Sequence, residues 1–313
     1  MAEIVAAFGL SHAALMLREW DRATPSERAT VKAGFDSVRE RLIAARPDTL
    51  MLIANDHFNT FSLHNMPAFA VGLGARSRGH GDGGLPAYDI PGNAALSYEM
   101  LEALNDEGYA PAFSIDMPVD HAFVTPLHLL TPAMDIPVVP LFQNCNAPPL
   151  PPFRRCFEMG GALRRVIEAT KNARRVAILG TGGLSHEIPL PDWRPLLASG
   201  GASPWLDQMT GNAERSRAAV MQEILEWSKN GLGRINEDFD RRILKAFELH
   251  DHDALKSLTT GDIARDAGNG AQELRNWVTM LGAVPDFVAE VVFYQPVAAW
   301  LTGIGAVALR PAS

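Results

Sequence analysis

Three histidines occupy the same kind of position in the sequence. His12 follows the apolar run IVAAF, His57 follows TLMLIA, and His186 follows VAIL. Each run has the unbroken apolar composition of a strand buried on both faces. Ligand sites of open α/β sheets lie beyond the carboxyl ends of the strands, so these imidazoles are expected to share one sheet edge. His121 follows the strand-like FSID and is a candidate fourth member.

A cluster of imidazoles at one sheet edge indicates a metal site or an acid–base site. Two histidines with one carboxylate suit non-haem Fe(II), whereas three histidines suit zinc with an activated water. Glu273, in GNGAQELRNWVTML, is a candidate carboxylate because it enters a helix directly after a glycine-rich break. A glutamate there also stabilises the helix dipole, so the pattern alone leaves both interpretations open.

The segment GTGG before His186 resembles a phosphate loop but lacks its chemistry. It has neither the GK[ST] of a P-loop nor the third glycine of GxGxxG. Its glycines instead allow a close approach of the backbone while His186 turns inward. Asp56 and Asp120 each precede a candidate histidine and are candidate partners that fix its tautomer. Glu187 has no assigned role.

Alternating strands and helices are expected to position these residues. Thr24, Pro25 and Glu27 form a capping-box start for a helix that ends near Pro47. Strands are expected at 4–8, 49–54, 111–116, 136–142 and 176–180, and helices at 25–46, 93–107, 123–130 and 153–170. Residues 67–92 are predicted to be a loop or irregular hairpin, 212–284 a helical block that packs on the sheet, and 291–309 strand-like.

This order predicts an α/β fold: a single domain over 1–313, with a central mixed sheet flanked by helices and a helical C-terminal segment. The 313 residues are 47% hydrophobic and can bury a sizeable core, and the net charge of −8 provides no basic field for nucleic acid. No apolar run could span a membrane, and Glu3 stands where a secretory signal carries basic residues. Cys145 and Cys156 form no CxxC motif, so we expect reduced thiols in a cytoplasmic protein.

Five segments, taken in order, resemble the class III extradiol ring-cleaving dioxygenases. They are GLSH, NDHFNTF, VDHAFVTPL, GTGGLSHEIP and GAQELRNWVTMLGA. That superfamily includes the catalytic subunit of protocatechuate 4,5-dioxygenase and 2,3-dihydroxyphenylpropionate 1,2-dioxygenase. The resemblance extends to YQPVAAWLTGIG and covers nearly the whole chain.

The resemblance implies a complete site. The family binds one Fe(II) through two histidines and a glutamate, which match His12, His57 and Glu273. The histidine of its GGxSH segment matches His186, an acid–base residue, and that of its DH segment matches His121, which lies near dioxygen. The implied reaction is Fe(II)-dependent meta cleavage of a catechol by O2, with both oxygen atoms entering a semialdehyde-type product.

The substrate and the distant alternatives are less constrained by the sequence. The chain length and the stretch HNMPAFAVGLGA resemble the single-chain dihydroxyphenylpropionate type, which favours a catechol with a carboxylated substituent. A lignin-derived catechol of the carboxylated hydroxybiphenyl, protocatechuate or gallate type is the rival. More distant alternatives for the function are a zinc-dependent hydrolase and a non-catalytic binding module on the same fold. Homo-oligomers are common in the family. Arginine is a natural carboxylate anchor, but the sequence places none in the pocket.

Overall fold

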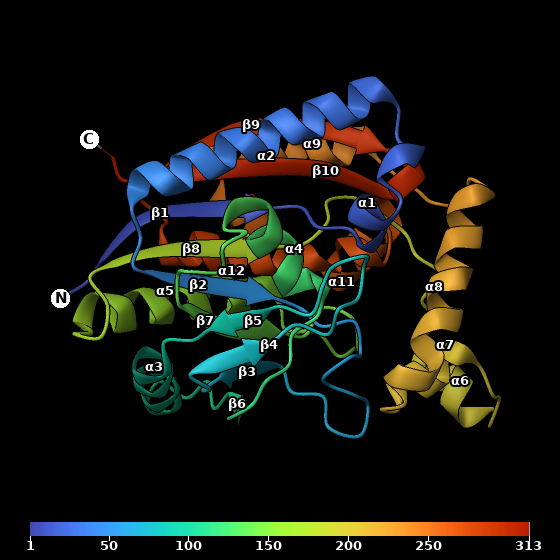
Figure 1. The fold of residues 1–313 in the computed structure, drawn as a ribbon, viewed down its shortest axis with the longest axis horizontal. Helices are drawn as coiled ribbons and strands as arrows, with labels where there is room; N and C mark the ends of the chain where they lie inside the picture. Colours follow the sequence, from blue (N-terminus) through green and yellow to red (C-terminus); the bar gives the residue numbers. More distant parts are fainter. Residues whose placement is uncertain (313) are drawn as a thin grey trace.

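A mixed eight-stranded sheet forms the centre of the computed structural model, which describes residues 1–312 (Figure 1). The strand order is β6-β3-β7-β2-β8-β1-β10-β9. Strands β7, β2, β8 and β1 are mutually parallel, whereas β10 and β9 add an antiparallel pair beside β1. The strands are β1 (Glu3–Leu10), β2 (Thr49–Ala54), β3 (Phe69–Gly72), β6 (Ala112–Ser114), β7 (Val138–Gln143), β8 (Arg175–Thr181), β9 (Val288–Val297) and β10 (Thr302–Arg310). The predicted α/β fold with a mixed sheet is confirmed.

Helices cover both faces of this sheet. On one face lie α2 (Pro25–Ala45) and α4 (His121–Leu130), and on the other lie α3 (Ala94–Asp106), α5 (Phe153–Ala169), α9 (Glu237–Glu248) and α12 (Leu274–Ala283). The remaining elements are α1 (Ala14–Arg18), α6 (Trp193–Ala198), α7 (Pro204–Met209), α8 (Ala213–Lys229), α10 (His252–Lys256), α11 (Thr260–Asp266), the 3-10 turns η1 (Trp20–Arg22), η2 (Gly270–Glu273) and η3 (Ala298–Trp300), and the hairpin β4 (Arg76–Arg78) with β5 (Asp89–Pro91). Among residues 1–312, no helix combines the length and apolar character needed to cross a membrane.

Local sequence signals explain where several elements begin. At the start of α2, the Thr24 hydroxyl accepts from the Glu27 amide at 3.3 Å, and the Glu27 carboxylate accepts from the Thr24 amide at 2.7 Å. This is the predicted capping box. The unalternating runs of β2 and β8 are buried because helices cover both of their faces.

Cys145 and Cys156 are buried free thiols, which agrees with the expectation of reduced thiols.

Two expectations about organisation differ from the structure. Residues 67–92 contain β3, a buried strand that pairs with β6 and β7 and therefore belongs to the main sheet. Four residues are too short to show periodicity, so the sequence predicts only a loop or irregular hairpin for this segment. The hairpin of β4 and β5 agrees with that prediction. The helical block packs on the sheet only through α9, α12 and their neighbours. Helix α8 stands off the end of the sheet with α6 and α7 (Figure 1).

A close helix crossing places the segment that carries Glu273. Helices α5 and α12 meet at Gly160 and Gly282, where there is no room for side chains. A Cβ on Gly160 would lie 2.1 Å from the Thr279 carbonyl oxygen, and one on Gly282 would lie 2.0 Å from that of Phe157. Because backbone atoms form both contacts, this crossing requires glycine and fixes α12 against the sheet.

We expect Gly160→Ala to lower the free energy of unfolding by about 1–3 kcal/mol, since the added methyl forces two helices apart. Gly161→Ala is the matched control, because the nearest atom to its Cβ is the flexible Arg165 Nη1 at 3.6 Å. That control should be neutral or should stabilise the helix by up to about 1 kcal/mol. Urea unfolding midpoints measure both variants. Equal effects at the two positions would contradict the proposed crossing.

Candidate active site and metal centre

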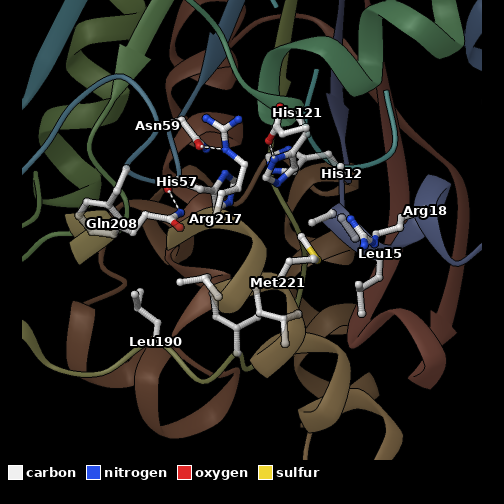
Figure 2. Close-up of a pocket in the computed structure, with 18 of the residues that line it drawn as sticks. His12, Leu15, Arg18, His57, Asn59, His121, Leu190, Gln208, Arg217 and Met221 are labelled. Carbon is white, nitrogen blue, oxygen red and sulfur yellow. Dashed lines mark hydrogen bonds and ion pairs between the residues drawn. The ribbon is translucent and has the colours of Figure 1, made fainter. Parts of the chain in front are cut away.

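The carboxyl ends of three parallel strands bring the predicted histidines together. His12 lies just beyond β1, His57 just beyond β2, and His186 in the loop after β8, which is the strand between them. All three line one cavity of about 470 Å³, and Figure 2 shows His12 and His57 in it. His121, the first residue of α4, and Glu273, the last of η2, line the same cavity. The structure therefore places all five sequence-predicted site residues in one pocket.

The tautomer of His12 follows from its partners. Its Nδ1 lies 2.6 Å from the Thr181 hydroxyl, which donates its own proton to the Ala122 carbonyl oxygen at 3.2 Å. Thr181 must therefore accept a proton from Nδ1, and this leaves a lone pair on Nε2. Burial lowers the pKa of His12, which favours the neutral ring. Within residues 1–312, this buried Nε2 has no hydrogen-bond partner and lies 3.6 Å from Glu273 Oε1.

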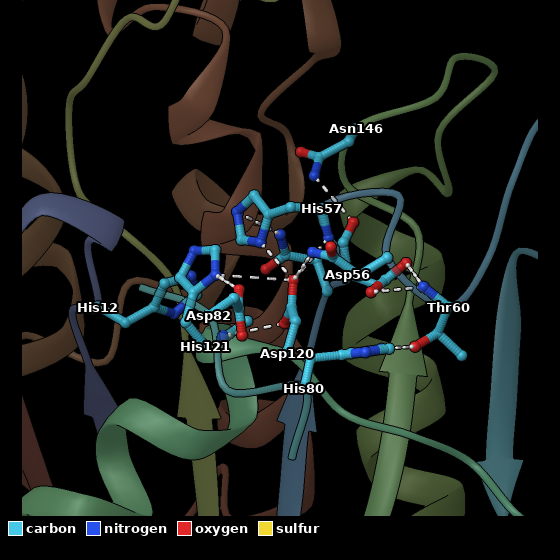
Figure 3. A network of polar contacts seen from close by, with 12 residues as sticks. His12, Asp56, His57, Thr60, His80, Asp82, Asp120, His121 and Asn146 are labelled. Carbon is cyan, nitrogen blue, oxygen red and sulfur yellow. Dashed lines mark hydrogen bonds and ion pairs between the residues drawn. The ribbon is translucent and has the colours of Figure 1, made fainter. Parts of the chain in front are cut away.

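His57 lies between two buried carboxylates, of which Figure 3 shows Asp120. Its Nδ1 is 2.9 Å from Asp120 Oδ2, and its Nε2 is 3.1 Å from Glu273 Oε1. Burial alone lowers the pKa of His57, but Asp120 and Glu273 outweigh it and raise the pKa well above its usual value. A divalent cation would compete with this proton for Nε2, because a metal ligand must be the neutral ring.

The two candidate tautomer-fixing aspartates differ in what they contact. Asp120 is fully buried, caps α4 through the Ala122 amide at 3.0 Å, and forms a hydrogen bond with His57. Its Oδ2 lies farther from the neighbouring His121, at 3.8 Å from Nδ1. Asp56 contacts no site histidine ring. Its carboxylate accepts from the backbone amides of residues 60 and 61, and it thereby orders the loop that follows His57.

Glu273 is held from both sides. Its Oε1 accepts from Asn55 Nδ2 at 2.8 Å, and its Oε2 accepts from the Gly183 amide at 2.7 Å. A Cβ on Gly182 would lie 2.5 Å from the Glu273 Cβ, so the GTGG segment packs directly on this residue. Burial raises the pKa of Glu273, but His12 and His57 outweigh it and hold the pKa well below its usual value. The carboxylate is therefore ionised.

Glycines also seat the ring of His186. A Cβ on Gly183 would lie 2.5 Å from this ring, and one on Gly270 would lie 2.0 Å from its Nε2. The Nδ1 donates to the Leu184 carbonyl oxygen at 2.8 Å, which leaves a lone pair on Nε2. This Nε2 lies 3.9 Å from Glu273 Oε2. The neighbouring Glu187 points elsewhere and forms a half-exposed ion pair with Arg234 at 3.0 Å.

His121 has a partner that the sequence did not reveal. Its Nδ1 lies 2.5 Å from Asp82 Oδ2, and its ring stacks on His57 at 4.2 Å between centroids. Burial raises the pKa of Asp82, but His121 outweighs it and the pKa is lowered. Asp82 comes from the turn GHGDGG, in which Gly81 and Gly83 have positive φ. An acid inside such a turn is the only sequence signal for this role.

The donor atoms fit a divalent cation in two ways. His12, His57 and His121 offer nitrogen atoms that lie within 4.8 Å of one another. Glu273 Oε1 lies 3.6 Å and 3.1 Å from the Nε2 atoms of the first two histidines, which gives a mixed set of two imidazoles and one carboxylate. The orphaned, buried lone pair of His12 belongs to both sets. Its orientation toward Glu273 favours the mixed set, which suits Fe(II).

A second buried carboxylate supports the loop before His186. Asp240, from α9, accepts from the Ser185 amide and the Ser185 hydroxyl, each at 2.7 Å, and from the Tyr294 hydroxyl at 2.8 Å. Burial raises the pKa of Asp240 to about 6. No sequence pattern indicated this contact, because α9 and β9 meet the loop only in the folded chain.

We expect Asp240→Asn to change how stability depends on pH. The folded-state pKa of about 6 lies above the unfolded value of 3.8, so the protonated carboxyl stabilises the fold at low pH. That contribution is lost as the pH rises through 6. The free energy of unfolding of the wild type should therefore fall by about 3 kcal/mol relative to that of the variant. Unfolding measured from pH 4 to pH 7 compares the two. Asp238→Asn, at an exposed position of the same helix, is the control and should show the pH dependence of the wild type. If the stability of Asp240→Asn also changed with pH in parallel with the wild type, the prediction would be contradicted.

The rest of the pocket wall is mainly apolar, with two arginines (Figure 2). Arg18 is the last residue of α1, and Arg217 comes from α8. The sequence had placed no arginine here. The larger apolar lining residues include Leu15, Ile188, Leu190, Trp205, Val220, Met221, Ile224 and Trp300.

Comparisons with known proteins agree on one family. A family model described as the catalytic LigB subunit of aromatic ring-opening dioxygenase matches residues 6–305. A Photorhabdus laumondii protein named 2,3-dihydroxyphenylpropionate/2,3-dihydroxicinnamic acid 1,2-dioxygenase is 35% identical over 294 residues, covering 90% of each chain. A Burkholderia vietnamiensis protein of the same name is 32% identical over 298 residues, covering 91% of this chain and 92% of the relative.

One solved structure supports the fold alone. An uncharacterized protein of Escherichia coli aligns with a TM-score of 0.55 and covers 97% of this chain and 99% of its own. The two chains are only 16% identical, so this similarity supports a shared fold and gives no information about the reaction.

Proposed function

Because the chain belongs to the LigB family of class III extradiol ring-cleaving dioxygenases, we propose that it cleaves a catechol bearing a carboxylated substituent, using one Fe(II) held by His12, His57 and Glu273. The relatives named above act, by their names, on 2,3-dihydroxyphenylpropionate and its cinnamic analogue. A substrate of the 2,3-dihydroxyphenylpropionate type is therefore favoured.

One observation carries the iron assignment: His12 and His57 are both held as Nδ1–H donors, so that their Nε2 atoms face Glu273 Oε1. Partners that fix a tautomer in this way are typical of metal-bound histidines. Two neutral imidazoles and one carboxylate leave coordination positions open. Fe(II) bound there would supply sites for both catechol oxygens and for O2.

Two histidines of the protein are suited to carry out the proton transfers of the reaction. His186 presents the Nε2 lone pair to the pocket while its Nδ1 is held by a neutral carbonyl, so it is suited to accept a proton from a catechol hydroxyl. His121 donates from Nδ1 to the Asp82 carboxylate, which can balance a positive charge on the ring. We assign His186 as the base and His121 as the group that donates a proton or stabilises negative charge on oxygen.

The overall reaction balances without another reactant. The carbon–carbon bond beside the two hydroxyl-bearing carbons breaks, and both atoms of O2 enter the product. One of the separated carbons becomes a carboxylate and the other a carbonyl. O2 is reduced and the ring is oxidised, so no additional electron donor is consumed. The product is a ring-opened, semialdehyde-type acid.

An oxygen-uptake panel tests the proposal. Protein loaded anaerobically with Fe(II) is given O2 and 2,3-dihydroxyphenylpropionate, protocatechuate, gallate or a carboxylated dihydroxybiphenyl. We expect one O2 consumed per catechol, a yellow product, and the highest kcat/KM with 2,3-dihydroxyphenylpropionate. A higher kcat/KM with another member would reassign the substrate. No uptake with any catechol would overturn the proposed activity, and hydrolysis restored by zinc would replace it.

We also propose that residues 1–313 form one catalytic domain that assembles as a homo-oligomer. The candidate ligands come from both ends of the sequence, which supports a single catalytic unit. Oligomerisation rests on the family resemblance alone. Light scattering coupled to gel filtration measures it, and a mass equal to one chain would contradict the prediction.

A further inference from the structure

Arg217 lies in the wall of the catalytic pocket. It is a half-buried residue of α8, and Figure 2 shows its side chain directed toward Asn59, beside the histidine cluster. Its Nε donates to Asn59 Oδ1 at 2.9 Å, and Asn59 Nδ2 donates to Asp120 Oδ2 at 3.2 Å. Because Asp120 also holds His57, Arg217 is tied to the site through a short chain of hydrogen bonds.

The other end of this guanidinium is unused. Only Nε makes a hydrogen bond, so the four N–H groups on Nη1 and Nη2 have no protein acceptor in the described part of the chain. Over residues 1–312, no carboxylate lies within 4.0 Å of the guanidinium. An arginine held by Nε presents its terminal edge in a fixed orientation, which matches the two oxygens of a carboxylate.

The other charged groups of the pocket are less suited to this role. Arg18 has a side chain that is 45% exposed, and its Nε lies 3.9 Å from the Glu19 carboxylate. Water and a nearby acid weaken its attraction for another anion. Glu214, three residues before Arg217, also lines the pocket and opposes a negative ligand. It is exposed, so solvent screens its charge.

We propose that Arg217 is a specificity-determining residue that pairs with the carboxylate on the substrate side chain. This inference rests on the proposed function for the identity of the aromatic ring. It also makes a claim that needs neither iron nor turnover: the pocket binds an anionic arylalkyl acid more tightly than its uncharged analogue. The apolar wall formed by residues such as Met221 and Trp205 would cover the intervening carbon chain.

Calorimetry on the metal-free protein tests the binding claim directly. The probes are 3-phenylpropionate and the uncharged 3-phenyl-1-propanol. We expect Arg217→Leu to weaken binding of the acid by about 10- to 100-fold and that of the alcohol by less than about 3-fold. Arg215→Leu, on the same helix but outside the pocket wall, is the matched control and should change neither.

Kinetics with iron provide the second measurement. For Arg217→Leu, KM for 2,3-dihydroxyphenylpropionate should rise by about 10- to 100-fold with kcat largely kept, while the constants for 3-methylcatechol stay within about 2-fold. Arg217→Lys should recover part of the loss. Equal losses on charged and uncharged ligands would overturn the proposal and make Arg217 a positioning residue for Asn59.

Other outcomes separate this inference from the proposed activity. A wild-type protein that binds the two probes equally, or binds neither, would overturn the inference, as would a preference that is lost in Arg18→Leu but kept in Arg217→Leu. If the acid preference depends on Arg217 but no catechol is oxidised, the anion site stands and the dioxygenase proposal fails.

Discussion

Replacing Glu273 by glutamine is expected to remove iron binding and ring cleavage together, with turnover falling by roughly 10³-fold or more. Glutamine keeps the length of the side chain but removes the negative charge. It also turns an amide N–H toward either Asn55 Nδ2 or the Gly183 amide, where the carboxylate accepts hydrogen bonds. The variant therefore loses both the candidate ligand and its orientation.

Metal content and oxygen uptake check this expectation on the same sample. Iron is measured after loading and dialysis, and circular dichroism confirms that the variant is folded. Glu187→Gln is the matched control, since Glu187 is an acid that forms a half-exposed ion pair outside the pocket. It should keep both iron and turnover.

A second variant separates the two donor sets. If the mixed set holds the metal, His121→Ala should retain iron while Glu273→Gln loses it. The reverse result would assign the metal to His12, His57 and His121, the set that suits zinc. Full iron content and turnover in Glu273→Gln would refute the assignment of this ligand.

Replacing His186 by glutamine is expected to lower kcat by about 10²- to 10⁴-fold while iron content stays the same. The ring is seated between Gly183 and Gly270, and its Nε2 is the free lone pair proposed to take the catechol proton. Glutamine fills similar space but cannot accept and return a proton near neutral pH. KM should change little, because the loss concerns a proton-transfer step.

The pH profile distinguishes this role from a structural one. The pH–rate profile of the wild type should contain a limb set by ionisation of the essential base. The profile of the variant should lack that limb. His64→Gln, at an exposed position outside the pocket, serves as the matched histidine control and should keep the wild-type profile. Loss of iron from His186→Gln would instead make His186 a ligand.

The sequence predicted the parts of the fold whose signals are local. Strands β1, β2 and β8 are unbroken apolar runs, and α2 begins with a capping box, so each could be identified within its own segment. Strand β3 is too short to show a period. Helices α6 and α7 have only six residues each, and they were missed for the same reason.

The candidate site also contains some residues that the sequence could predict and others that it could not. Residues that follow strands could be predicted, because parallel strands end at one sheet edge. Their partners could not, because the partners depend on strand order and register. Thr181 meets His12 because β8 lies between β2 and β1 and pairs Thr181 with Leu10. Asp82 and Arg217 line the pocket, and Asp240 contacts Ser185 outside it. Apart from the glycine-rich turn around Asp82, their segments carry no sequence signal for these positions.

The interior position of β1 has a consequence for how the protein is made. This strand carries the first candidate ligand, yet its neighbours in the sheet are β8 and β10, from the second half of the sequence. During synthesis the nascent chain holds an apolar strand without a partner until those segments leave the ribosome. Such long-range pairing makes folding slow and exposes the emerging chain to aggregation. Iron loading is accordingly expected to be a late, post-translational event, and production of active protein should depend on chaperone capacity.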